Sequence, residues 1–166
     1  GGWDGFWGAS EGGAGDVAGD ATVRRQEGAK AAGIGIMVKR EAADGYWDNV
    51  WMKTPMSASN WNARPTADLI LTLIYHSEAE WNETQWKNDR FDELLVMGRK
   101  TTDPALRYEI YCEAETLLHD DGGAFNPMYM NFVEGVHKRI QNYKGSSAFG
   151  LSAGLLYEEI WVDENA

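Results

Sequence analysis

The sequence predicts an α/β fold, and two stretches of the chain carry that prediction. The first, residues 20–39, combines a helical segment, a glycine and a segment in which apolar residues alternate as they do in strands. The second, residues 88–121, holds two amphipathic helices in succession. A helix that leads directly into a strand, followed by paired helices, is typical of layered α/β domains.

The first stretch is predicted to pair a helix over residues 20–32 with a strand that begins at Ile34. Asp20 offers an N-cap side chain, and Gly33 suits the left-handed position that ends many helices. Residues 1–19 are rich in glycine, and we predict no helix or strand there, only a flexible end. A phosphate-binding loop is the alternative, but we predict no strand before it and no Gly-Lys-Ser/Thr sequence follows.

Three shorter elements are predicted between the two stretches. Aromatic residues at near-helical spacing predict a short helix over residues 44–52, and residues 56–61 predict a strand. Apolar residues at helical spacing predict a helix over 66–75, with Thr66 as its N-cap.

The paired helices have clear start and stop signals. Asn88 can cap the first helix, whose acidic first turn and basic last turn suit the helix dipole. Asp103, followed by a proline, caps the second helix, and Gly122 ends it. The apolar stripes are Phe91, Leu94, Leu95 and Gly98 on the first helix and Ile110, Tyr111, Ala114, Leu117 and Leu118 on the second. We expect these stripes to form the core. Beyond them, residues 124–133, which include Pro127, and residues 155–162 predict two strands.

Composition narrows the function. Hydrophobic residues make up 43% of the chain and eight are Trp, which indicates a folded protein. A net charge of −11 without a basic cluster argues against nucleic-acid binding. No run approaches the roughly 18 apolar residues of a membrane span. The three His lie far apart and no nucleophile motif is present, so we predict no catalytic residue, metal site or cofactor.

One known family shares an ordered set of these residues. The set is Trp81-Asn82, Trp86, Asn88, Phe91-Asp92, Leu94-Leu95, Asp103, Arg107, Tyr111, Gly122-Gly123, Pro127 and Asn131, preceded by Ala31 to Pro55 and Asn60 to Pro65. In this set the chain resembles the C-terminal part of family 5 solute-binding proteins, the peptide, opine and nickel type that serve ABC transporters. The resemblance implies a truncated C-terminal lobe of a two-lobed, periplasmic-binding-protein-like fold, of the cluster that carries an extra domain.

The resemblance also implies an organisation and a set of partners. Residues 20–130 would form the C-terminal α/β lobe, residues 131–166 would return to an N-terminal lobe that is missing here, and residues 1–19 match no part of the family. The expected function is solute uptake without bond chemistry. The chain, as a fragment, would form one wall of a cleft for a peptide, an opine or a sugar-like solute. An ABC permease would be the membrane partner. The location would be periplasmic or extracellular, at the membrane, although the chain carries no signal peptide.

Trp61 and Arg64 are the first candidate ligand-binding residues, since they follow a predicted strand and ligands of α/β lobes bind beyond strand ends. An indole can form a flat pocket wall, and a guanidinium can hold a carboxylate through paired donors. In peptide-binding members, the resemblance implies, the Trp is followed three residues later by an Asp that pairs with the peptide ammonium. Arg64 stands there in this chain and favours a solute with an anionic group. The alternative is a surface ion pair between Arg64 and Asp68.

Tyr46, Trp47, Asn60 and Asn62 flank the same loop and are the next candidates. The aromatic rings could stack on a solute and the amides could bind hydroxyl groups, whereas the alternative for the two rings is a place in the core. We interpret Trp81 and Trp86 as structural. Two other function classes stay open, a stand-alone carbohydrate-binding module and, with less support, a small hydrolase.

Overall fold

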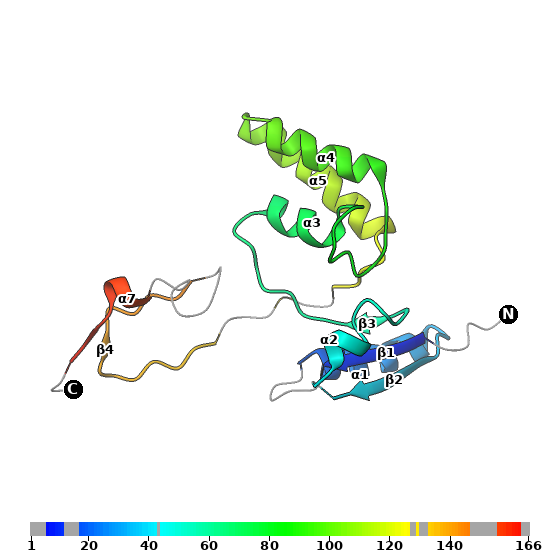
Figure 1. Ribbon diagram of the computed structural model, residues 1–166, viewed down its shortest axis with the longest axis horizontal. Coiled ribbons are helices and arrows are strands. Elements are labelled where there is room, and N and C mark those ends of the chain that lie inside the picture. Colours follow the sequence, from blue (N-terminus) through cyan, green and yellow to red (C-terminus); the bar gives the residue numbers. More distant parts are fainter. Residues whose placement is uncertain are drawn as a thin grey trace.

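The structure is a computed structural model that describes residues 6–11, 17–42, 44–126, 129, 133–146 and 156–163. Figure 1 shows three parts. The α/β part contains β1 (Phe6–Glu11), α1 (Val17–Ala31), β2 (Ile36–Glu41), α2 (Tyr46–Asn49) and β3 (Ser57–Ala58). The helical part contains α3 (Ala67–Tyr75), α4 (Asp89–Lys100) and α5 (Pro104–Asp121). The C-terminal part contains β4 (Ile140–Gln141), α7 (Leu156–Glu159) and β5 (Trp161–Val162).

The sheet of the α/β part is parallel, with the strand order β2-β1-β3. β1 lies at its centre and pairs with β2 from Phe6–Ile36 to Glu11–Glu41. The prediction that residues 1–19 hold no element was therefore wrong for β1. Its partner strand lies 30 residues away in the sequence, so local periodicity could not reveal the pairing. Within this stretch the structure describes residues 6–11 and 17–19, and it does not describe residues 1–5 and 12–16.

Helix α1 contacts all three strands and covers one face of the sheet. It begins at Val17, so Asp20 lies inside the helix and the prediction that it is the N-cap was wrong. Gly33 ends the helical turn as predicted, with a φ of 76°. The Gln26 side-chain amide donates to the carbonyl oxygen of Ile36 at 2.7 Å, which attaches α1 to the start of β2.

Helix α2 and strand β3 are shorter than predicted, at four and two residues. Gly45 precedes α2 with a φ of 80°, a backbone conformation that residues with a side chain rarely adopt. Tyr46 is 1% exposed, and its hydroxyl donates to the carbonyl oxygen of Ala58 at 2.8 Å. This bond fixes α2 against β3, the strand that leads into the candidate site.

The helical part follows the sequence predictions closely. Thr66 accepts a hydrogen bond from the Leu69 amide, and Asn88 accepts one from the Phe91 amide. Asp103 accepts from the amides of the second and third residues after it. All three predicted N-caps are thus confirmed. The buried core consists of Leu71, Phe91, Leu94, Leu95, Ile110 and Ala114, and it confirms the predicted stripes.

Gly98 lets α4 and α5 approach closely. A Cβ atom built at this position would lie 2.6 Å from Cζ of the Tyr111 ring, well inside van der Waals contact. We expect Gly98→Ala to lower the free energy of unfolding by about 1–3 kcal/mol, because the rigid ring must move. Gly28→Ala in α1 is the matched control, since nothing lies within 4 Å of its Cβ position. That substitution should instead raise stability by about 0.5–1 kcal/mol. Urea unfolding followed by circular dichroism measures the stability change of each variant. If both changes have the same sign, this account of the packing between α4 and α5 is contradicted.

The C-terminal part differs from its predictions. β4 and β5 pair antiparallel. Of the predicted strand over 155–162, four residues form the helix α7, and Trp161 and Val162 form the strand β5. Lys144 pairs with Glu159 at 2.7 Å across this part. In the predicted strand over 124–133, the described residues 124–126, 129 and 133 have no strand conformation. Pro127 and Asn131, which the same prediction involved, lie outside the described residues.

Candidate functional site

Four indole rings from three segments form a continuous row, which we call the aromatic strip. It consists of Trp47 in α2, Trp51 after α2, Trp61 after β3 and Trp81 in the loop between α3 and α4. Successive ring centroids lie 5.4, 6.3 and 5.8 Å apart. The two end members, Trp47 and Trp81, are 45% and 44% exposed, so the strip lies partly at the surface. Contacts of this kind stabilise aromatic pairs beyond simple burial.

Glu83 connects the members of the strip. The Nε1–H groups of Trp51 and Trp61 donate to its carboxylate, the second at 3.1 Å. The Ser59 hydroxyl lies 2.8 and 2.9 Å from the two carboxylate oxygens. The carboxylate therefore holds two indole rings with their N–H edges toward it. Burial raises the pKa of Tyr75, and the negative charge of Glu83 raises that pKa further.

The loop that carries Trp81 and Glu83 is organised by Asn82, which is 5% exposed. Its side-chain amide donates to the carbonyl oxygens of Trp86 at 2.7 Å and His76 at 3.3 Å. Its Oδ1 accepts from the Thr84 hydroxyl at 2.8 Å. Both N–H donors and the oxygen of this buried amide are thus hydrogen-bonded within the described chain, which fixes the backbone of the loop that carries Trp81 and Glu83.

The structure brings some predicted site residues together and separates others. Trp61 and Trp47 both lie in the aromatic strip. Tyr46 packs edge-on against Trp47 at 5.4 Å, but its burial places it in the core, as the alternative interpretation held. Trp86 packs on Phe91 and is structural, as predicted.

Arg64 and the two asparagines lie in the exposed loop around Trp61. Arg64 donates from Nη1 to the carbonyl oxygens of Asn62 at 2.8 Å and Ala63 at 3.3 Å. The alternative pairing with Asp68 is wrong, because Asp68 accepts from Arg99 instead, at 2.9 Å. Asn60 and Asn62 are exposed. The side-chain amides of Asn60 and Asn62 form no hydrogen bond to another residue in the part of the chain that the structure describes.

Sequence reasoning missed Trp51, Ser59 and Glu83 as site residues, and it read Trp81 as structural only. Glu83 lies 22 to 32 residues from its three donors. A single glutamate in a polar stretch gives no signal of such contacts. The high Trp content was the one available hint.

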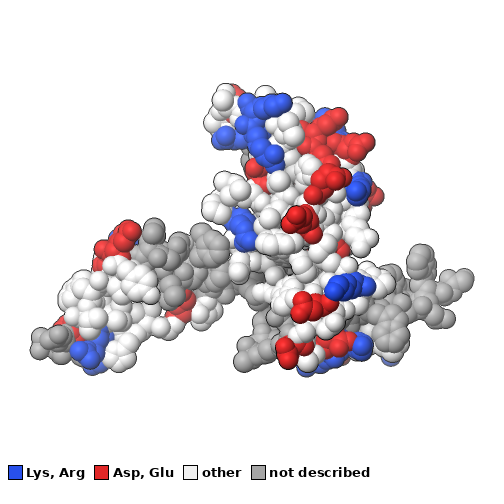
Figure 2. Space-filling model, viewed as in Figure 1, with Lys and Arg blue, Asp and Glu red and all other residues white. Residues whose placement is uncertain are grey.

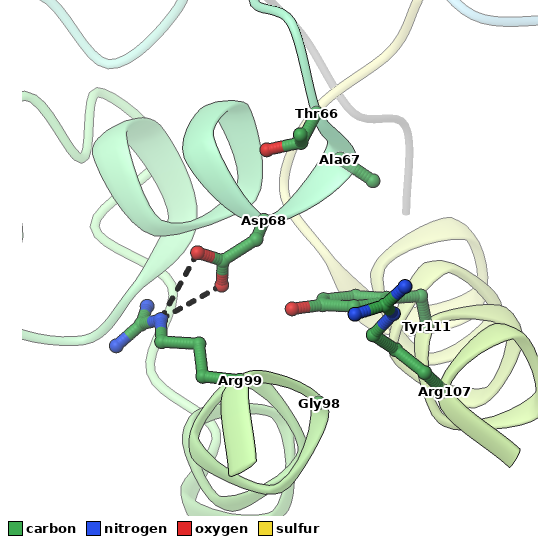
Figure 3. A pocket seen from close by; sticks show the side chains of 7 residues that line it. All are labelled: Thr66, Ala67, Asp68, Gly98, Arg99, Arg107 and Tyr111. Atoms are coloured by element: carbon green, nitrogen blue, oxygen red, sulfur yellow. Dashed lines mark hydrogen bonds and ion pairs between the residues drawn. The ribbon is translucent and has the colours of Figure 1, made fainter. Parts of the chain in front are cut away.

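A hollow of about 410 Å³ lies in the helical part, apart from the aromatic strip (Figure 3). Thr66, Ala67, Asp68, Gly98, Arg99, Arg107 and Tyr111 line it. The Asp68 carboxylate points at Arg99, and the Tyr111 hydroxyl points into the same space. Burial raises the pKa of Tyr111, and the charge of Asp68 and a hydrogen bond to it add to that rise. The ion pair connects α3 to the end of α4, so this hollow has a structural explanation.

Charge and metal-ligand patterns add little to the site. On the face shown in Figure 2, Lys and Arg gather at the upper left of the helical part and Asp and Glu to their right, and residues of both charges lie side by side on the α/β part. Within the described ranges, no group of three or more His, Cys, Asp or Glu could hold a metal ion. None of the helices in those ranges is both long enough and apolar enough to cross a membrane.

Neither a family model nor a curated protein sequence matches this chain, but solved structures do. The oligopeptide-binding protein AppA from Bacillus subtilis, in complex with a nonapeptide, superposes with a TM-score of 0.71 at 18% identity. The match covers 96% of this chain and 32% of AppA. NikZ from Campylobacter jejuni, in complex with Ni(L-His), has a TM-score of 0.60 at 15% identity, over 72% of this chain and 25% of NikZ.

A third match is the ABC transporter-associated periplasmic binding protein DppA from Helicobacter pylori, in complex with the peptide STSA. Its TM-score is 0.60 at 17% identity, over 72% of this chain and 24% of DppA. The chain therefore has the fold of part of an ABC-transporter solute-binding protein, which confirms at the level of fold the resemblance described above. It spans between 24% and 32% of the length of these three proteins.

Proposed function

We propose that this chain binds a small solute for uptake by an ABC transporter and forms one wall of the ligand cleft. The shared fold supports the class of function, and the three similar proteins bind a nonapeptide, a tetrapeptide and a nickel–histidine complex. The opposite wall of the cleft would come from polypeptide that this chain does not include, because the chain matches at most 32% of the length of each of these three proteins. Closure of two walls on the solute, rather than bond chemistry, would be the mechanism.

The aromatic strip is the single observation that carries this proposal. It combines rings from α2, from the loop after β3 and from the loop before α4, so its formation depends on tertiary folding. Trp47 and Trp81 stay nearly half exposed. Large apolar rings gathered at a surface mark binding sites more often than scattered ones do. Indole faces suit planar or apolar parts of a solute.

Arg64 supports a solute that also carries an anionic group. Its Nη1 donates to the two backbone carbonyl oxygens, and no other residue that the structure describes accepts from its remaining N–H donors. A guanidinium binds carboxylates through such paired donors. Peptides, opines and related amino-acid conjugates satisfy this requirement. The permease partner and the periplasmic or extracellular location follow from the same class of proteins and belong to the proposal.

A carbohydrate is the second candidate solute, because aromatic faces next to the exposed amides of Asn60 and Asn62 suit a sugar ring as well. The two candidates differ in charge dependence. A neutral saccharide should bind equally well with or without Arg64, whereas an anionic solute should not. Arg64→Gln therefore separates them in a calorimetric titration.

We expect Trp61→Ala to weaken solute binding about tenfold, which corresponds to the loss of one aromatic contact. The measurement is isothermal titration of the longest polypeptide that the gene encodes, against the peptide STSA, nickel–histidine and an opine. Trp161→Ala is the matched control, because Trp161 is an exposed indole in β5, outside the strip. Unchanged affinity of the Trp61 variant for every solute that binds would remove the strip from the site. If none of the three solutes binds, the proposed function is contradicted.

A further inference from the structure

We propose that the aromatic strip receives a cationic group of the solute, an ammonium, and that Glu83 is the counter-charge that selects it. This inference rests on the proposed function and narrows its substrate class. It adds a specificity-determining residue that carries a charge opposite to that of Arg64.

The first argument is the charge of Glu83. Its three hydrogen-bond donors, the indoles of Trp51 and Trp61 and the hydroxyl of Ser59, are all neutral. These bonds satisfy the carboxylate oxygens but do not cancel the negative charge. No ion pair to Glu83 is found within the described ranges. By contrast, the half-buried carboxylate of Asp68 does have a cationic neighbour, since its Oδ1 lies 2.9 Å from Nε of Arg99.

The second argument is the orientation of the rings around that charge. Because Trp51 and Trp61 direct their N–H edges at the Glu83 carboxylate, the faces of both rings are turned away from it. The face of an indole carries negative electrostatic potential and attracts cations within about 6 Å of the ring centroid. The strip thus combines a fixed carboxylate with several ring faces. Both features attract a cation.

The third argument compares how favourably neutral, anionic and cationic groups of a solute would bind at the aromatic strip. A neutral apolar group on the strip would displace water from an uncompensated carboxylate, and that desolvation is unfavourable. An anionic group would be repelled. A cation gains from the rings and also replaces the water that stabilised the carboxylate. An ammonium on the strip together with a carboxylate at Arg64 describes an amino-acid-like, zwitterionic solute.

The test compares two probes of nearly the same shape, choline and 3,3-dimethylbutan-1-ol, in which a carbon replaces the positive nitrogen. Tryptophan fluorescence is followed during titration of the full chain at constant ionic strength. We expect saturable quenching by choline, with an affinity at least about tenfold above that of the neutral probe. In Glu83→Gln the preference should fall below about threefold, because the charge is gone while the shape is kept.

Glu78→Gln is the matched control, since Glu78 lies in the same loop, is exposed and pairs with Lys87. It should keep the preference for choline. Equal affinities of the two probes for the unmodified chain, or no saturable quenching by choline, would overturn the inference. An unchanged preference in a folded Glu83→Gln variant would overturn it too. If that variant fails to fold by near-ultraviolet circular dichroism, the comparison of probes on the unmodified chain decides. Peptide binding that depends on Trp61 but shows no ammonium preference would leave the proposed function standing while this inference fails.

Discussion

Leu94→Ala is expected to lower the free energy of unfolding of the helical part by about 2–5 kcal/mol. Leu94 is 0% exposed and packs in α4 against the core residues of α3 and α5. Removing its side chain loses apolar burial and leaves a cavity between helices that hydrogen-bonded caps hold in place, so the site can collapse only partly. Urea unfolding followed by far-ultraviolet circular dichroism measures the change.

Leu106→Ala is the matched control for this substitution. Leu106 lies in the first turn of α5, in the same pair of helices, and is 50% exposed. Its truncation should cost about 1 kcal/mol or less, because little apolar surface is uncovered and no cavity forms. Similar losses for the two variants would mean that the core of the helical part does not lie along the Phe91–Leu95 stripe.

Asn82→Asp is expected to cost about 3 kcal/mol of stability and to disturb the aromatic strip. The substitution keeps the size of the side chain but replaces its N–H donors with an oxygen. That oxygen would face the carbonyl oxygens of His76 and Trp86, which now accept hydrogen bonds from Asn82. A buried acceptor opposite two acceptors is unfavourable, and more so when it is charged. Since Glu83 follows directly in the chain, its contact with Trp61 should weaken as well.

The size of this effect should depend on pH in a defined direction. A protonated carboxyl can donate to one of the two carbonyl oxygens, so the loss of stability should shrink as the pH falls. Asn126→Asp is the control, because Asn126 is exposed. Urea unfolding measures stability, and near-ultraviolet circular dichroism reports the indole environment. An Asn82→Asp variant as stable as the control, with an unchanged tryptophan spectrum, would contradict the role assigned to this amide.

The elements with local signals were predictable from the sequence. α4 and α5 each have a cap and an apolar stripe within a single short segment, α4 also has a charge pattern, and all of these agree with the structure. α3 was predictable for the same reason. In contrast, β1 has no such signal, because its status as the central strand depends on pairing with residues 36–41 and 57–58. The overlong prediction for β3 has a related cause, since only two of its residues find a partner.

The candidate site was predictable only in part. Trp61 and Arg64 were found because their loop follows a strand, and Trp47 because it lies nearby in the sequence. Glu83 joins segments more than 20 residues apart, and only the folded chain shows that its donors are neutral. Asp68 was assigned to Arg64 on spacing, although the contact between α3 and α4 gives it to Arg99.

The central claim is that the aromatic strip contacts the solute. The most direct measurement is a nuclear magnetic resonance titration that follows the indole N–H signals of the tryptophans during addition of the solute that binds best by calorimetry. The proposal predicts saturable shifts for Trp47, Trp51, Trp61 and Trp81. It predicts none for Trp86, whose indole N–H donates to Asp121 at 2.9 Å outside the strip. Saturable binding that leaves all four strip signals unmoved would contradict the account.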